Sequence, residues 1–152
     1  MYSGPTANSV SGQLVACHGD SCEIYNGRGE WVHLVNTSSA RRYHTSAENE
    51  NGILLIGGLP NPPRRSTEWI PLDGSPSKPG PFDVRHGSDH CTIQLSPDLI
   101  VVTGGDYAED LVTSYQLTGD GDETSLTSLN QGRAVHACGV YQDAGGQQVR
   151  RL

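Results

Sequence analysis

Three histidines are the residues of this chain whose type and spacing most suggest chemistry. His44, His90 and His136 lie in "RRYHTS", "GSDHCT" and "RAVHAC", and successive members are 46 residues apart. An imidazole can act as a general acid or base, or can ligate a metal. Recurrence at a fixed interval favours a structural role instead, because a buried imidazole bonded to neighbouring backbone would serve identically in every repeat.

Cysteines offer a second possible site, in "CHGDSC" at residues 17–22. Cys17, His18 and Cys22 could form half of a metal site, but their spacing fits no standard zinc pattern. A disulfide is possible in an oxidising compartment, whereas free thiols are the expected state, and the sequence leaves the compartment open. Cys91 and Cys138 lie one residue out of phase in successive units, so we expect them to point to opposite faces and to remain unpaired.

Other patterns indicate little chemistry. "TGDGDET" (118–124) lacks the ligand spacing of a calcium loop and stands where a hairpin turn is expected. The sequence contains no serine nucleophile elbow and no phosphate loop. We therefore predict that the chain is not an enzyme and uses no metal or cofactor.

Net charge and hydropathy argue against nucleic acid and membrane as partners. The formal net charge is −7, with acidic residues bunched at "ENE" (48–50) and "DGDE" (120–123), and no basic stripe is present. We therefore expect no nucleic-acid binding, and we attribute the negative charge to solubility. No run of 18 apolar residues occurs, so we expect no membrane span.

A repeat organises the elements that must position these residues. The apolar runs in "ENGILLIGGLPNPP" (49–62) and "PDLIVVTGGDYAED" (97–110) both end in Gly-Gly, 47 residues apart. Thr67 and Thr113 are 46 residues apart, and an aromatic residue follows each at the second position. The runs predict strands covered on both faces, with glycines allowing a sharp turn at positive φ. The chain then divides into a partial unit (1–37), two full units (38–84 and 85–131) and a second partial unit (132–152).

Each full unit predicts four short antiparallel strands. In 85–131 they are "DHCTIQL", "DLIVVTG", "LVTSYQL" and "TSLTSL", which are rich in Val, Ile, Leu and Thr and bounded by turn residues. A period of 45 to 50 residues with four strands is typical of a β-propeller blade.

These motifs resemble those of the kelch repeat. Arg-x-x-His stands on the first strand, Gly-Gly closes the second, an aromatic lies on the third, and "WVHL" (31–34) or "SLTSL" (125–129) holds the fourth. His18 departs from the pattern, since it stands where the first glycine is expected. The resemblance implies an all-β, kelch-type propeller segment of about three blades, each of four antiparallel strands, and thus a partial or half propeller.

The ends of the chain suggest how the units close. Residues 132–152 are expected to supply a first strand to the partial unit at 1–37. Two such chains could close a six-bladed ring as a homodimer. A fragment of a longer protein, begun and ended within a blade, is the favoured alternative.

The resemblance further implies protein–protein interaction through the propeller loops. Guanidinium groups on one rim would suit a partner protein or acidic peptide. For Arg85 and Arg133, packing between blades through backbone carbonyls is an equal alternative. The predicted binding residues are Arg64, Arg65 and Tyr107 in loops and Arg41, Arg42, Arg85 and Arg133 around the channel mouth.

Two other functions stay open. Some kelch-like propellers are copper radical oxidases, which need a cross-linked Tyr–Cys pair and a Tyr/His copper shell. A truncated propeller fragment with no function of its own is the second alternative.

Overall fold

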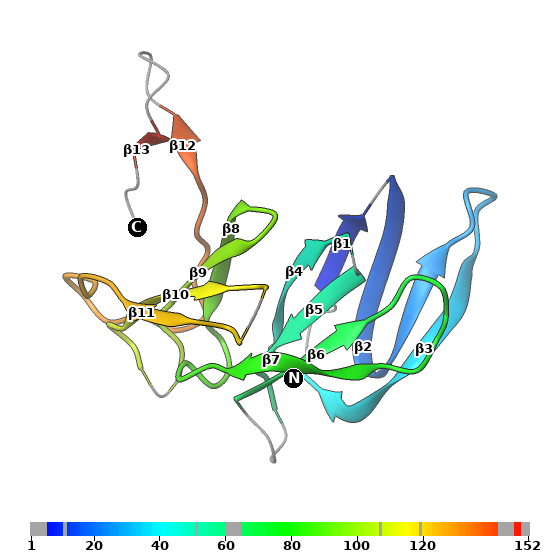
Figure 1. Cartoon of the computed structure of the whole chain (residues 1–152), viewed down its shortest axis with the longest axis horizontal. Coiled ribbons are helices and arrows are strands. Elements are labelled where there is room, and N and C mark those ends of the chain that lie inside the picture. Colours follow the sequence, from blue (N-terminus) through cyan, green and yellow to red (C-terminus); the bar gives the residue numbers. More distant parts are fainter. Residues whose placement is uncertain are drawn as a thin grey trace.

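A computed structural model describes residues 6–10, 12–50, 52–59, 65–106, 108–118, 120–142 and 148–149. These residues form strands and turns and no helix, so none of their elements is a helix able to cross a membrane. Three antiparallel sheets stand side by side, and a short hairpin follows them (Figure 1). The prediction of an all-β fold is confirmed, and the arrangement of the sheets is consistent with a propeller-like fold.

The strands follow one another in chain order within each sheet. The N-terminal sheet has β1 (Thr6–Val10), β2 (Gln13–Tyr25) and β3 (Trp31–Arg41). The middle sheet has β4 (Thr45–Asn49), β5 (Gly52–Ile56), β6 (Ser66–Ile70) and β7 (Lys78–Asp83). The third sheet has β8 (Cys91–Ser96), β9 (Leu99–Thr103), β10 (Val112–Gln116) and β11 (Glu123–Ser125), and the hairpin has β12 (Tyr141–Gln142) and β13 (Gln148–Val149).

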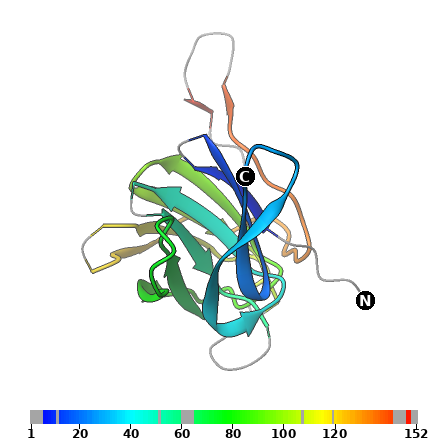
Figure 2. The same ribbon diagram turned by 90° about the vertical axis from the view of Figure 1, so that its right-hand side faces the viewer.

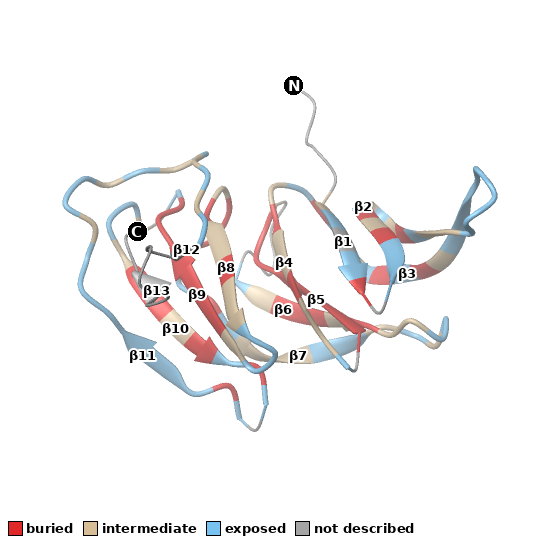
Figure 3. Ribbon diagram, turned by 90° about the horizontal axis from the view of Figure 1, so that it is seen from above, coloured by how far each residue is buried: buried red, intermediate tan, exposed pale blue. Residues whose placement is uncertain are grey.

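Strand β5 shows why the apolar run is unbroken. All five of its residues are buried (Figure 3). Ile53 and Leu55 belong to the apolar layer that the middle sheet shares with the N-terminal sheet. Leu54 and Ile56 belong to the layer that it shares with the third sheet. Because successive side chains of a strand point to opposite faces, a strand between two neighbours must be apolar throughout.

The Gly-Gly pairs allow the chain to turn where the sheets approach most closely. Gly58 has φ +104°, and a Cβ placed on it would lie 2.8 Å from the carbonyl oxygen of Arg42 and 2.9 Å from the Cβ of His44. Its N–H donates to the carbonyl of Gly87, which directly precedes the third sheet. Only glycine satisfies both the positive φ and the close approach.

The 46-residue period is also a property of the backbone. Tyr43, Asp89 and Val135, each immediately before a repeated histidine, have φ of 57°, 57° and 52°. The N–H of Asp89 donates to the carbonyl of Tyr43 at 3.1 Å, and the N–H of Val135 donates to the carbonyl of Asp89 at 2.9 Å. Equivalent residues of successive units are therefore joined directly by main-chain hydrogen bonds.

The N-terminal sheet differs from the four-strand pattern. Its strand β2 runs through 13 residues and continues past His18 and Gly19, where the Gly-Gly pattern of the other units predicts the end of a strand. Strand β1 pairs with β2 along its whole length, so residues 6–10 supply the first strand of this sheet. The expectation that residues 132–152 supply it is wrong for their described strands, since β12 and β13 pair with each other. The segment "TANSV" is short and polar, and Val10 is the one of its described residues that lies in the core, so its strand character is weak in the sequence.

Both expectations for the cysteines were wrong. All four cysteines form disulfides, Cys17 with Cys22 and Cys91 with Cys138. The first bond joins two buried residues of β2 that lie on either side of a register shift, with Cα atoms 4.1 Å apart. A straight strand would hold residues five apart much further from each other, so the local irregularity makes this pairing possible.

The second disulfide repeats a contact found one unit earlier. Thr45 and Thr92, each 46 residues before a cysteine of this pair, share a hydrogen bond of 2.6 Å between their hydroxyls. Within a single sheet, an offset of one residue would point the two cysteines to opposite faces. In the structure the same offset makes them face each other, because the two residues belong to neighbouring units and not to one sheet.

We expect the Cys91–Cys138 bond to stabilise the chain more than the Cys17–Cys22 bond does. The Cys91–Cys138 bond closes a separation of 47 residues, and the Cys17–Cys22 bond closes a separation of five. Loop entropy in the unfolded state then favours the native chain by about 4 and about 2 kcal/mol, respectively. Urea unfolding of the two double Cys→Ala variants measures both contributions.

A double threonine variant provides the matched control. Cys91→Thr with Cys138→Thr reproduces the residues of the Thr45–Thr92 contact. We expect it to be more stable than the double alanine variant at the same positions, and equal stability of the two would contradict the proposed equivalence.

Candidate functional site

The repeated histidines are bound through their Nε2 atoms to threonine hydroxyls. The prediction that these imidazoles bond to neighbouring backbone is wrong, because their partners are side chains. His44 and His90 are 5% and 4% exposed, and the Nδ1 atoms of all three histidines are buried without a hydrogen-bond partner among the described residues. The pairs are His44 with Thr6 (2.8 Å), His90 with Thr45 (2.8 Å) and His136 with Thr103 (2.9 Å).

Burial keeps these imidazoles neutral. Desolvation, with a contribution from the nearby Arg41, lowers the pKa of His44 to about 4. Desolvation and the neighbouring histidines lower the pKa of His90 to about 3. A neutral imidazole joined to a threonine of another strand is a packing element, so the repeated position has a structural role.

Arg41, predicted on the channel rim, lies inside the molecule. It is 4% exposed, and its Nε is 3.2 Å from Oε2 of Glu68, which is equally buried. Its Nη1 donates to the carbonyls of Gly57 and Ser66, both at 2.9 Å. The guanidinium therefore holds the Gly-Gly end of β5 in place and is not presented to a partner.

His86 holds the Gly-Gly end of β9 in the next unit, as Arg41 holds that of β5. Its Nδ1 lies 2.7 Å from the carbonyl of Gly104, and its Nε2 is hydrogen-bonded to the hydroxyl of Thr113. It is fully buried, and desolvation lowers its pKa. Sequence reasoning did not single out His86 or Glu68, because neither shares a repeat position with a residue of the same type.

Four of the predicted arginines are exposed: Arg42, Arg65, Arg85 and Arg133. They lie toward the Gly-Gly end of the sheets. Arg42 pairs with Leu59 through the backbone, and Arg133 accepts a hydrogen bond from the N–H of Gly105. Arg85 forms an ion pair of 3.0 Å with Glu123. Arg64 and Tyr107 lie outside the described residues, so their predicted contacts stay predictions.

For Arg133 the main chain carries the packing contact. Its carbonyl accepts from Gly105 at 3.0 Å and its N–H donates to the carbonyl of Glu109 at 2.8 Å. Its side chain is exposed, with Nε 3.4 Å from the carbonyl of Gln131. Packing through backbone and presentation of the guanidinium are therefore compatible at this position.

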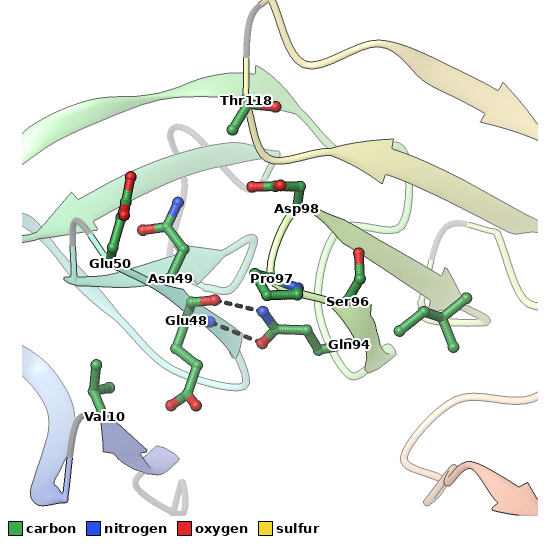
Figure 4. Close-up of a pocket in the computed structure, with 10 residues that line it drawn as sticks. Val10, Glu48, Asn49, Glu50, Gln94, Ser96, Pro97, Asp98 and Thr118 are labelled. Carbon is green, nitrogen blue, oxygen red and sulfur yellow. Dashed lines mark hydrogen bonds between the residues drawn. The ribbon is translucent and has the colours of Figure 1, made fainter.

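A cleft of about 760 Å³ opens at the other end of the strands, away from the Gly-Gly turns. It lies where the β4–β5 and β8–β9 turns adjoin (Figure 4). Strand β1 reaches it through its last residue. The lining residues are Val10, Glu48, Asn49, Glu50, Gln94, Leu95, Ser96, Pro97, Asp98 and Thr118.

A hydrogen-bonded bridge holds the floor of the cleft. The N–H of Glu48 donates to Oε1 of Gln94 at 3.0 Å, and the Gln94 amide donates back to the carbonyl of Glu48 (Figure 4). The two residues are 46 apart and thus occupy the same place in successive units. The bridge fixes the middle sheet against the third, so the cleft is preformed.

The cleft is negatively charged. Glu48, Glu50 and Asp98 contribute carboxylates, and none of the lining residues is a lysine, arginine or histidine. Figure 4 shows Asn49 and Asp98 facing each other across the opening. The sequence shows both acidic turns, and "ENE" was attributed to solubility. The turns belong to different units, and only the side-by-side placement of the sheets brings them together.

The described residues contain no group of three or more His, Cys, Asp or Glu side chains able to hold a metal ion. The cleft therefore has to be judged by its shape and charge.

Comparison with known proteins supports the fold and leaves the family open. No family model matches the sequence, and no curated protein matches it. A solved structure of YjhT is similar, with a TM-score of 0.73 and 12% sequence identity. The similarity covers 88% of this chain and 54% of YjhT, so the chain spans about half the length of that protein. At this identity the similarity shows the fold alone.

We expect acid to destabilise the protein through the buried histidines. In the unfolded chain they titrate near 6.5, whereas the native pKa values of His44 and His90 are about 4 and about 3. As the pH falls below 6.5, only the unfolded state takes up these protons, so the free energy of unfolding falls. At about 1.4 kcal/mol per pKa unit, His44 alone accounts for roughly 3 kcal/mol by pH 4.

Urea unfolding between pH 7 and pH 5 measures this slope. We expect His90→Gln to have a flatter slope than the unmodified chain, because it lacks one such group. His33→Gln, at an exposed position of β3, is the matched control for the substitution itself. Carboxylates, among them Asp89 with its raised pKa, contribute equally to all three proteins and cancel in the comparison. An identical slope for His90→Gln would contradict the assignment.

Proposed function

We propose that this chain is a protein-interaction module that binds a segment of a partner in the acidic cleft. The observation that carries the proposal is the cleft itself, about 760 Å³ in volume and held open by the Glu48–Gln94 bridge between two sheets. Pre-formed concave sites bind with little ordering cost, since their walls are already in place.

The lining favours binding over catalysis. The cleft has carboxylates and amides but no serine–histidine pair or cysteine thiol that could act as a nucleophile. The disulfides engage all four cysteines, so none is available for the Tyr–Cys cross-link of a copper radical oxidase. The kelch resemblance supports the same choice, because it implies recognition through loops on a rigid scaffold.

The charge of the cleft defines the chemistry of the partner. Three carboxylates without a neighbouring cation among the lining residues suit a segment that carries lysine or arginine. Leu95 and Pro97 add apolar surface on which the stem of a long basic side chain can lie. A short basic segment in extended conformation fits this description.

The Gly-Gly end is a second candidate surface. Arg42, Arg65 and Arg133 are exposed there, and Arg85 is 60% exposed although it pairs with Glu123. This exposure supports the proposal that an acidic peptide or protein binds at this end. Arg41 is excluded from that surface by its burial.

Fluorescence anisotropy with a labelled oligoarginine peptide tests the cleft. We expect the double variant Glu50→Gln with Asp98→Asn to bind this peptide about five- to tenfold more weakly, since each exposed ion pair contributes up to about 1 kcal/mol. The matched control, Asp20→Asn with Glu23→Gln, removes the same charge from exposed positions of the N-terminal sheet and should bind as the unmodified chain does.

Equal weakening by the two double variants would mean that the peptide responds to net charge only, and would overturn the assignment of the cleft. The same anisotropy experiment with a labelled oligoglutamate peptide tests the exposed arginines at the Gly-Gly end. Binding that is lost in Arg42→Gln with Arg65→Gln would place recognition at the Gly-Gly end instead.

We also propose that two copies of the chain associate into one ring of sheets. Six large apolar side chains are more than a third exposed in the described part of the chain, and none belongs to the middle sheet. They are Leu14, Trp31 and Val32 in the N-terminal sheet and Leu126, Val135 and Val140 after β11. Apolar surface at both ends of a stack of sheets suits a two-fold pairing.

Size-exclusion chromatography with light scattering tests this association. We expect a folded species of twice the 16.3 kDa chain mass. Trp31→Ser, which truncates one of the exposed apolar side chains, should shift the species toward the monomer. A folded monomer of the unmodified chain would contradict the pairing.

A further inference from the structure

We infer that Asn36 is a site of N-linked glycosylation. Asn36-Thr37-Ser38 is the one Asn-x-Ser/Thr sequence of the chain in which x is not proline. Such a sequence is an acceptor only where the asparagine is accessible and where the chain enters the compartment that holds the transferase. The structure bears on both conditions.

Asn36 is accessible on an edge strand. It is exposed, whereas its neighbours Val35 and Thr37 are both buried. Since side chains alternate along a strand, burial of both neighbours directs Asn36 to the outer face. Strand β3 pairs only with β2 within the N-terminal sheet, and the β2–β3 hairpin stands in front of the other sheets when viewed onto that face (Figure 2).

The rest of the acceptor sequence leaves room for a glycan. The hydroxyl of Thr37 donates to the carbonyl of Ser39 at 2.9 Å and points into the structure. Ser38 is exposed, and its backbone N–H donates to Oε1 of Glu68 at 2.5 Å. The strand is thus fixed through its main chain and its inward side, and neither contact uses the Asn36 side chain.

The disulfides supply the second condition independently. Both pairs, Cys17–Cys22 and Cys91–Cys138, are formed, and no cysteine remains free. Disulfides persist in oxidising compartments, chiefly the secretory pathway and the extracellular space. Of these compartments the endoplasmic reticulum also holds the transferase that modifies asparagine, and the proposal places the chain there.

The reaction transfers an oligosaccharide from a lipid-linked diphosphate donor. A bond forms between Nδ2 of Asn36 and the anomeric carbon of the first sugar, and the bond from that carbon to the diphosphate oxygen breaks. The amide gives up one proton to a base of the transferase, and the lipid diphosphate leaves with the bonding electrons. No oxidant or reductant is required.

A glycan at Asn36 also bears on the proposed association of two copies. Trp31 and Val32 of the same strand are exposed and belong to the surface that is proposed to pair. The glycosylated chain is therefore expected to associate less than the unglycosylated chain. Asn36 does not line the acidic cleft, so the modification leaves the proposed binding site open.

Secretion of the full chain from eukaryotic cells, behind an added leader, tests the assignment. We expect a heavier species that loses its extra mass on treatment with an amide-cleaving N-glycosidase, with conversion of Asn36→Asp seen by peptide mass spectrometry. Ser38→Ala should abolish the shift and Ser38→Thr should retain it, and both keep the backbone bond to Glu68. Retained intracellular chain is analysed in the same way, since transfer occurs during entry into the secretory pathway.

An unmodified Asn36 in chain that has formed both disulfides would overturn the assignment. Extra mass that resists the N-glycosidase, as with sugars on the hydroxyls of Thr37 to Ser39, would overturn it as well. Asn36→Gln serves as the second negative variant, and its disulfide content, measured by mass after alkylation, shows whether the chain still folds.

Discussion

Burial of both faces of the middle sheet is the constraint on which the rest of the structure depends. Strand β5 cannot exist as a stable element without a neighbour on each side, because Ile53 and Leu55 would face water on one side and Leu54 and Ile56 on the other. The stack satisfies this by placing the N-terminal and third sheets against the two faces of the middle one. The main-chain bonds and the histidines, which recur at 46 residues, and the Glu48–Gln94 bridge, whose residues are 46 apart, join neighbouring units of this stack.

The contacts that recur in successive units are of two kinds, main-chain hydrogen bonds and side-chain hydrogen bonds between histidine and threonine. Main-chain bonds join Tyr43, Asp89 and Val135 in sequence, at a φ that few residues other than glycine adopt. Beside each lies a histidine bonded to a threonine of another strand. Strain in the backbone is thus offset by hydrogen bonds in the same place. The glycine pairs leave the space in which these contacts form.

The sequence was sufficient for features that depend on periodicity. The repeated histidines, the Gly-Gly ends, the four strands of the middle sheet and the first three strands of the third sheet follow from residue type and spacing. The fourth strand of the third sheet was predicted at "TSLTSL" (124–129), whereas β11 ends at Ser125. The sequence was insufficient wherever two units meet. Thr45 and Thr92 show that a one-residue offset brings side chains together across units, and reasoning within one sheet therefore separated Cys91 from Cys138. Arg41 was assigned to the rim because its buried partner, Glu68, is distant in the chain. The cleft was missed for the same reason, since its two acidic turns become adjacent only after stacking.

The bond between Cys91 and Cys138 also has a mechanical consequence. It spans a separation of 47 residues that includes all of β8 to β11, so the whole third sheet lies inside one covalent loop. Tension applied between the two termini would pass through the sulfur atoms and bypass that sheet. The middle and N-terminal sheets would bear the force and unfold first. The residues of the third sheet could extend only after the disulfide was reduced. The chain therefore has a tension-resistant segment at one end, whose extensibility is set by the redox state of its surroundings.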